Sequence, residues 1–222
     1  TLFTIFLAII LAIYNWNSNK NVIYLAIFLI GISVSTLTLH LTVAGGSVYL
    51  YALLLNNFAP FYYLAIPMLY FFIRGMVSES SNLTKKDSFH FIPFFIHCIG
   101  VFPYWVLNFS TKLDIAQRIF ENPLIYADIE FCWLYPHIIN NIARPILLFV
   151  YFITSIILLH RFYVNTQNTT DKYIKQQFNR IYRFISVFLT IILVLIFLDL
   201  YIGIQFMLNT DIKIIYTKIH TF

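Results

Sequence analysis

Two charged residues lie inside long apolar stretches of this sequence, where their chemistry would be unusual. Arg144 lies in the stretch from about residue 137 to 160, and Asp199 lies in the stretch from about 184 to 208. If these stretches are consecutive antiparallel helices that cross a membrane, the two side chains lie roughly 10 and 13 Å from the same surface. An unpaired charge at such depth costs about 2.5–3.5 kcal/mol. We therefore predict an ion pair, which either fixes the helix register or forms a polar centre for a ligand or a proton.

A second group of candidate residues lies near the same predicted surface. The stretch 110–136 combines carboxylates with aromatic side chains, a composition typical of a membrane–water interface. Any ligand that approaches from this side would meet these residues first. We predict a ligand region around His97, Asp128, Glu130, Trp133 and His137.

The sequence does not predict a metal site, a cofactor or a catalytic centre. His90 and His97 are seven residues apart, about two helical turns, whereas metal-binding pairs on helices are spaced by three or four residues. We expect His90 to bond within the loop that precedes it. The hydrolase elbow, the phosphate-binding glycine loop and the HExxH motif are missing from the sequence. A membrane-bound enzyme is therefore the last of the function classes that we consider.

The composition indicates that the chain folds in a lipid bilayer. Of the 222 residues, 60% are apolar and only 10% are charged, against about 25% in soluble domains. The mean hydropathy is +0.81, and the apolar runs approach the ~20 residues that a spanning helix needs. Backbone groups in lipid must be satisfied within the segment, so we predict an all-α, polytopic membrane helix bundle in a single domain. The expected spans are residues 1–14, 21–44, 58–76, 89–108, 137–160 and 184–208, with a truncated seventh span in the tail after 208.

Three segments between these spans carry their own patterns. Lys112–Glu121 has the apolar spacing of an amphipathic helix, which Asn122 and Pro123 end. Ser47–Asn57 is either an interfacial helix or the beginning of the third span. Asp171–Phe184 is basic and amphipathic, which favours an anchor on anionic lipid over an element that transmits motion.

The distribution of lysine and arginine predicts the orientation. The connections after the first, third and fifth spans hold nine such residues, whereas those after the second and fourth hold two, Lys112 and Arg118. Basic residues are retained on the cytoplasmic side. The N-terminus and the stretch 110–136 are then outside. The nine residues are Lys20, Arg74, Lys85, Lys86, Arg161, Lys172, Lys175, Arg180 and Arg183.

About 45 residues, from Phe58 to Tyr104, resemble the N-terminal membrane region of bacterial AraC-type helix-turn-helix regulators. In that family a PxLYxYxR run is followed by a Lys-Lys-Asp-like loop, an HFxPF run and a Pro-Tyr. Phe72 replaces the second tyrosine of the first run. The matching residues here are Pro67, Leu69, Tyr70, Arg74, Lys85, Lys86, Asp87, His90, Phe91, Pro93, Phe94, Pro103 and Tyr104.

The resemblance implies a membrane-embedded sensor in the bacterial inner membrane. Seven spans would pass an envelope signal or a small molecule to a cytoplasmic DNA-binding domain, which this chain lacks, so we expect the chain to be a fragment. DNA would be a partner only through that domain, the lipid bilayer is a partner throughout, and a homodimer is compatible with the sequence. The alternative from another class is a small transporter or permease subunit, which should show an inverted repeat or broken helices near mid-membrane.

Overall fold

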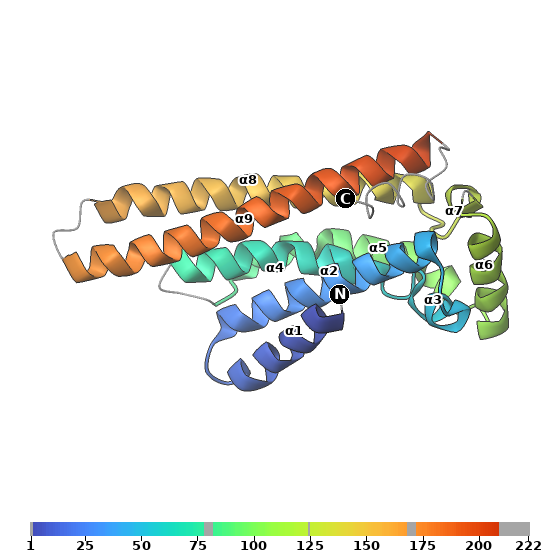
Figure 1. The fold of residues 1–222 in the computed structure, drawn as a ribbon, viewed down its shortest axis with the longest axis horizontal. Helices are drawn as coiled ribbons and strands as arrows, with labels where there is room; N and C mark the ends of the chain where they lie inside the picture. The colour runs from blue at the N-terminus through green and yellow to red at the C-terminus, as the bar shows by residue number, and fades with distance from the viewer. Residues whose placement is uncertain (1, 78–81, 124, 168–171, 209–222) are drawn as a thin grey trace.

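The computed structural model describes residues 2–77, 82–123, 125–167 and 172–208, and every regular element that they form is a helix (Figure 1). Four helices are long and apolar enough to cross a membrane. They are α2 (Lys20–Ala44), α4 (Ala59–Val77), α8 (Asn140–Gln167) and α9 (Lys172–Met207). The predicted helical membrane bundle is therefore confirmed in its class.

The structure does not confirm six spans. Helix α1 (Leu2–Asn15) has only 14 residues, about 21 Å at 1.5 Å per residue, against a hydrocarbon thickness of about 30 Å. Among the described residues, a fifth candidate span results only if a bent pair of helices is counted as one. The predicted start of a seventh span, residues 209–222, lies outside the described residues.

The predicted fourth span, residues 89–108, is divided. The 3₁₀ helix η1 (Lys85–Phe91) leads into α5 (Ile92–Trp105), and α6 (Phe109–Glu121) follows at an angle of 101°. Pro93 is the second residue of α5, where a missing N–H costs no helical hydrogen bond. Pro103 lies inside α5, and the helix ends at Trp105, short of the predicted boundary at residue 108.

Short helices cover the end of the bundle at which α5 meets α6, which we call the α6 end. The stretch 47–57 forms a separate helix, α3 (Val48–Leu54), rather than the beginning of the third span. Its cap Ser47 accepts a hydrogen bond from the Leu50 N–H at 3.3 Å. Helix α6 buries Ala116 and Ile119 against α3, as its amphipathic spacing predicted. The helix α7 (Ile125–Asp128) and the 3₁₀ helix η2 (His137–Ile139) complete this end.

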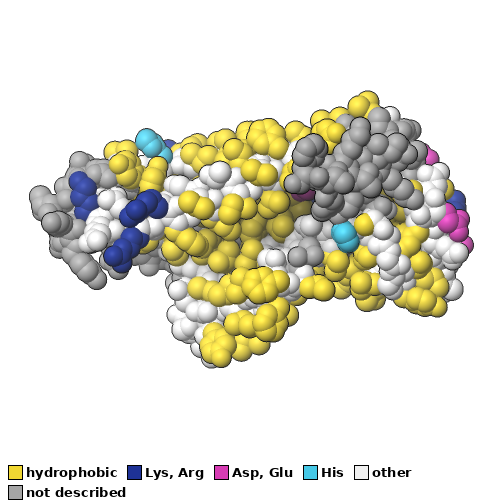
Figure 2. Space-filling view, in the orientation of Figure 1, with side chains coloured by type: hydrophobic (Ala, Val, Ile, Leu, Met, Phe, Trp, Pro, Cys, Tyr) yellow, Lys and Arg dark blue, Asp and Glu magenta, His cyan; other side chains and the backbone are white. Residues whose placement is uncertain are grey.

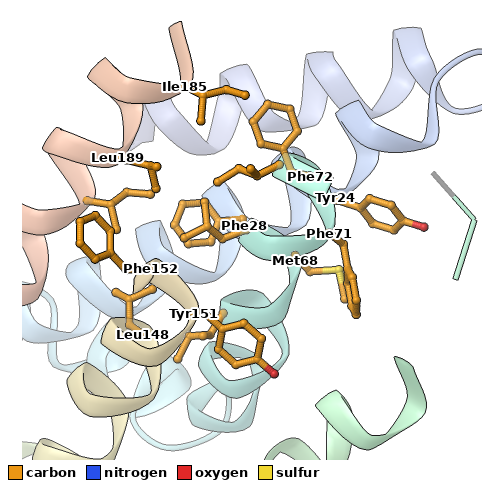
Figure 3. Packing of buried hydrophobic residues seen from close by; sticks show 14 of the residues in the cluster. Tyr24, Phe28, Met68, Phe71, Phe72, Leu148, Tyr151, Phe152, Ile185 and Leu189 are labelled. Carbon is orange, nitrogen blue, oxygen red and sulfur yellow. The ribbon is translucent and has the colours of Figure 1, made fainter. Parts of the chain in front are cut away.

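The main core lies where α2, α4, α8 and α9 meet (Figure 3). Phe28 and Phe72 both place their rings edge-on to Phe188 of α9, with centroids 6.2 and 6.0 Å away. Leu148 and Phe152 of α8 are also buried in this cluster. Lipid tails are as apolar as these side chains, so close packing rather than exclusion of water stabilises the bundle.

Helices α2 and α4 approach closely at one glycine. A Cβ atom at Gly31 would lie 2.3 Å from the Cβ of Ala65 and 3.3 Å from the carbonyl oxygen of Phe61. Only a residue without a side chain fits this crossing. Small residues let helix backbones make the van der Waals contacts that hold membrane helices together.

The connections that carry most of the basic residues lie at the end opposite the α6 end, which we call the basic end. The Nζ of Lys20, after α1, donates to Oδ1 of Asn82, after α4, at 2.9 Å. Figure 2 shows lysine and arginine side chains at this end, hydrophobic side chains along the middle, and acidic side chains at the α6 end. Figure 1 shows that the α8–α9 pair reaches farther than α2 and α4 at the basic end.

The described part of the basic segment, residues 172–184, is the beginning of α9, and two of its aromatic side chains pack on α8. The rings of Phe178 and Phe162 lie 5.0 Å apart, and those of Tyr182 and Tyr163 lie 4.7 Å apart, both between α9 and α8. Arg180 and Arg183 remain exposed. These two ring pairs therefore join α9 to α8, and the anchoring of this segment on anionic lipid stays a prediction.

The close crossing at Gly31 generates a stability prediction. Gly31→Leu should lower the free energy of unfolding in bicelles by about 1–3 kcal/mol, because the new side chain must push α4 away from α2. Thr36→Leu is the matched control, since Thr36 is exposed on the same helix and its hydroxyl bonds only to the Ile32 carbonyl. Equal stability of the two variants would contradict the packing described here.

Candidate functional site

A pocket of about 110 Å³ lies between α2, α4, α8 and α9, close to the α6 end. Thr38 and Thr42 line it from α2, Tyr62 from α4, Arg144 from α8 and Asp199 from α9. The pocket lining thus combines these polar side chains with apolar ones such as Val34, Leu54 and Ile202. The structure brings the two charged residues singled out in the sequence to one cavity.

Arg144 lies over two aromatic rings, and two of its guanidinium nitrogens have no hydrogen-bond partner. Its guanidinium carbon lies 5.5 Å from the centroid of the Tyr62 ring and 5.7 Å from that of Tyr63. A cation over aromatic faces gains about 2 kcal/mol or more when it is removed from water. Its Nε and Nη2 atoms are buried and have no hydrogen-bond partner in the structure. Arg144 is therefore stabilised but keeps unused hydrogen-bond donors.

The predicted ion pair between Arg144 and Asp199 is not formed. Among the described residues, the ion pair closer than 4 Å is that of Arg74 with Asp87. Instead, the Tyr62 hydroxyl donates to Oδ2 of Asp199 at 3.0 Å, while the Tyr62 ring supports Arg144. Tyr62 thus contacts both charged residues, Asp199 through its hydroxyl and Arg144 through its ring. Hydropathy and charge patterns in the sequence do not indicate these contacts.

Two asparagines add further unused donors to the pocket. Asn56 is 4% exposed and Asn141 lies one helical turn before Arg144, and the side-chain nitrogen of each is buried without a partner. Both residues line the pocket. Asn56 adopts a φ of 51°, a conformation that asparagine tolerates better than most residues. This turn between α3 and α4 sets the position of its side chain beside the helices.

A buried polar network lies beside the pocket and centres on Asn140, the first residue of α8. Its Oδ1 accepts hydrogen bonds from the hydroxyls of Tyr63 at 2.7 Å and Tyr135 at 3.1 Å. His137 Nδ1 lies 3.4 Å from its Nδ2. His97 Nδ1 lies 2.6 Å from the Tyr135 hydroxyl, so α4, α5, α8 and the stretch before η2 meet at one amide.

These contacts determine which atoms carry protons. Because Tyr135 donates to Asn140, His97 must donate from Nδ1 to the Tyr135 oxygen, which leaves His97 Nε2 as an acceptor. Asn140 donates to Nδ1 of His137, so Nε2 of His137 donates to the Tyr126 hydroxyl at 2.8 Å. Burial, followed by the charge of Arg144, lowers the pKa of His137 to about 3. His137 is thus held neutral, and the contacts favour one tautomer for each of the two rings.

The structure divides the predicted ligand region into two parts. His97 and His137 are buried in the polar network, at 0% and 1% exposure. Asp128, Glu130 and Trp133 are exposed. The Trp133 indole donates to the Ile99 carbonyl at 2.8 Å, and Glu130 accepts the His137 backbone N–H at 3.0 Å. None of these five residues lines the pocket.

Sequence reasoning missed the residues that complete the site: Tyr62, Tyr63, Asn56, Asn140 and Asn141. The asparagine pair carried a usable signal. Asn140 and Arg144 are four residues apart, so they share one helix face, and consecutive polar residues at the beginning of an apolar run are costly unless they are satisfied. The two tyrosines carried none, because many aromatic residues in this chain face lipid or the core.

Four residues of the stretch 58–104, namely Arg74, Asp87, His90 and Tyr70, form a separate cluster at the basic end. Arg74 donates to both oxygens of Asp87, at 2.7 and 3.0 Å, and Asp87 also accepts from Thr84. His90 Nδ1 lies 2.6 Å from the Tyr151 hydroxyl, so this histidine bonds to α8 and not within its loop. Tyr70 places its ring beside His90 at 5.7 Å.

The remaining motif residues are distributed along α4 and α5. Pro67 is buried within α4, and Phe91 packs beside Phe71 with ring centroids 6.0 Å apart. Tyr104 is buried near the α6 end, under Lys112, whose Nζ lies 5.0 Å from the ring centroid. Among the described residues, no three His, Cys, Asp or Glu side chains are grouped as metal ligands would be.

No protein-family model, curated protein or solved structure matches this chain. The arrangement of its own side chains is therefore the basis for assigning a function.

The neutral state of His137 predicts a pH-dependent stability. In the unfolded chain His137 takes up a proton below about pH 6.5, whereas the folded protein resists protonation down to about pH 3. The stability that His137 contributes is thus present above pH 6.5 and lost as the pH falls toward 3.

His137→Gln should flatten the pH dependence of thermal unfolding by up to about 1.4 kcal/mol per pH unit below pH 6.5. His160→Gln is the control, because His160 is exposed on α8, the helix that follows η2. An unchanged slope in His137→Gln would mean that this histidine is not held neutral.

Proposed function

We propose that this chain is the membrane-embedded sensor region of a one-component transcription regulator of the AraC type. One observation supports the sensing part of the proposal. Helix α9 lines a pocket whose lining residues include buried donors without a partner, and the same helix extends to the basic end. A signal molecule in the pocket would change how α9 packs on α8. The resemblance of residues 58–104 carries the regulatory part.

Helix α9 is suited to transmit such a change. It has 36 residues, about 54 Å at 1.5 Å per residue, well beyond the thickness of the hydrocarbon layer. A Cβ atom at Gly203 would lie 2.5 Å from the carbonyl oxygen of Asn141, so α9 touches α8 closely beside the pocket. Pro145 has no N–H to donate to that carbonyl, which leaves it available to the neighbouring helix.

The distribution of lysine and arginine supports an orientation in which the basic end lies in the cytoplasm and the pocket lies nearer the outer surface of the membrane. This orientation would expose the pocket to an envelope signal and place the tip of the α8–α9 pair next to a cytoplasmic domain. We propose the bacterial inner membrane as the location, with the N-terminus of the chain outside and DNA bound only through a further domain.

The coding sequence tests the regulatory part. Read beyond the codon for Phe222, it should encode a helix-turn-helix domain within about 150 codons. With the full-length regulator and a reporter for its own promoter, Arg144→Gln should change the response to growth conditions. Arg161→Gln, exposed near the basic end of the same helix, should leave that response unchanged. A continuation without a helix-turn-helix would refute the assignment.

A transporter is the second candidate, and the bent pair α5–α6 favours it. Transporters bind substrates beside interrupted helices, and the 101° break between these two helices is of that kind. The break lies at the α6 end, however, and neither helix lines the pocket. Proteoliposomes that accumulate an organic acid or an amino acid against its gradient would favour transport over sensing.

A further inference from the structure

The unused donors of Arg144 are those that suit a carboxylate. Nε–H and Nη2–H point from one edge of the guanidinium in parallel, which is the edge that binds a carboxylate through two hydrogen bonds. Both atoms are buried, so bulk water does not satisfy them. The Tyr62 and Tyr63 ring centroids lie 5.5 and 5.7 Å from the guanidinium carbon, and the two nitrogens of this edge have no partner in the structure.

The other unused groups that line the pocket have the same hydrogen-bonding character. The side-chain nitrogens of Asn56 and Asn141 are donors, and neither has a partner. With the two nitrogens of Arg144, four buried donor atoms without a partner belong to residues that line one cavity. A buried donor without a partner costs about 1–3 kcal/mol, and more when it is charged. A ligand rich in acceptor oxygens would remove this cost.

Asp199 restricts the ligand further. It lies in the same pocket, and the Tyr62 hydroxyl occupies one of its oxygens. One cation and one carboxylate give the pocket little net charge, so a doubly charged phosphate would be repelled by Asp199. A molecule that carries a carboxylate for Arg144 and a hydroxyl or protonated amine for Asp199 complements both groups. Its size is limited by the volume of about 110 Å³, which exceeds the requirement of a single water molecule.

We infer that the pocket binds a small amino or hydroxy acid, with its carboxylate on the Nε–Nη2 edge of Arg144 and its hydroxyl or amine toward Asp199. This inference rests on the sensing function proposed above, because it names the class of signal that the pocket takes. Asn56 and Asn141 donate to the remaining carboxylate lone pairs.

Binding is tested on the purified chain in nanodiscs, by calorimetric titration with glycine, β-alanine, γ-aminobutyrate, glycolate, acetate and inorganic phosphate. The three amino acids differ in the distance between carboxylate and amine, so the best of them measures the separation of Arg144 and Asp199. At least one amino acid or glycolate should bind more tightly than acetate by about tenfold, the effect expected of a hydrogen bond to a charged group. Phosphate should not bind.

Variants of Arg144 and Asp199 test separately the binding of the carboxylate and the binding of the hydroxyl or amine. Arg144→Lys keeps the charge but loses the two-pronged edge, so it should weaken every carboxylate by about tenfold or more. Asp199→Asn should remove only the preference over acetate. Asn141→Asp opposes a carboxylate without altering Arg144, which keeps the test valid if Arg144→Lys does not fold. Arg161→Lys is the control on the same helix and should bind as the unmodified chain does.

Failure to bind any of these acids, or tighter binding of phosphate than of every carboxylate, would overturn the inference. The second outcome would point instead to a lipid headgroup. Failure of the proposed function is distinguishable, because the acids would then bind while the full-length regulator shows no change in reporter output.

Discussion

The bundle must accommodate one arginine, Arg144, in a setting where lipid offers its guanidinium no hydrogen bonds. The rings of Tyr62 and Tyr63 support the cation, and the hydroxyls of the same tyrosines bond to Asp199 and Asn140. Two consecutive residues of α4 thereby join α8, α9 and the polar network. The donors that remain unused are the reason for treating this place as a binding site and not only as a structural crossing.

The molecule places its two charged centres at different depths and uses them differently. At the basic end, Arg74 is saturated by Asp87, an arrangement that fixes the connection between α4 and α5. Near the α6 end, Arg144 stays unsaturated beside a cavity. An arginine that is hydrogen-bonded to a carboxylate suits a rigid connection between helices. An arginine with donors that have no partner suits a site that can bind a ligand. The long α8–α9 pair links the two ends.

The sequence was sufficient for the helical class and for the boundaries of most long helices, because lipid requires apolar runs of a fixed minimum length. It was insufficient where boundaries depend on tertiary contacts: α5 ends early and the chain bends into α6. Arg144 and Asp199 were identified because charge is rare in such runs. Their separation by Tyr62, the role of Asn140 and the burial of His97 depend on packing between helices, which hydropathy does not encode.

The central claim is that the state of the pocket determines the position of the α8–α9 pair at the basic end. It is tested most directly by the distance between spin labels at positions 86 and 176, both exposed, with Cys98 and Cys132 replaced by alanine. Gly203→Leu, which must wedge α9 away from α8 beside the pocket, should shift this distance distribution, as should a bound carboxylate. Ile204→Leu, next to it and exposed, should not. An unchanged distribution in Gly203→Leu, with the protein still folded, would contradict the claim.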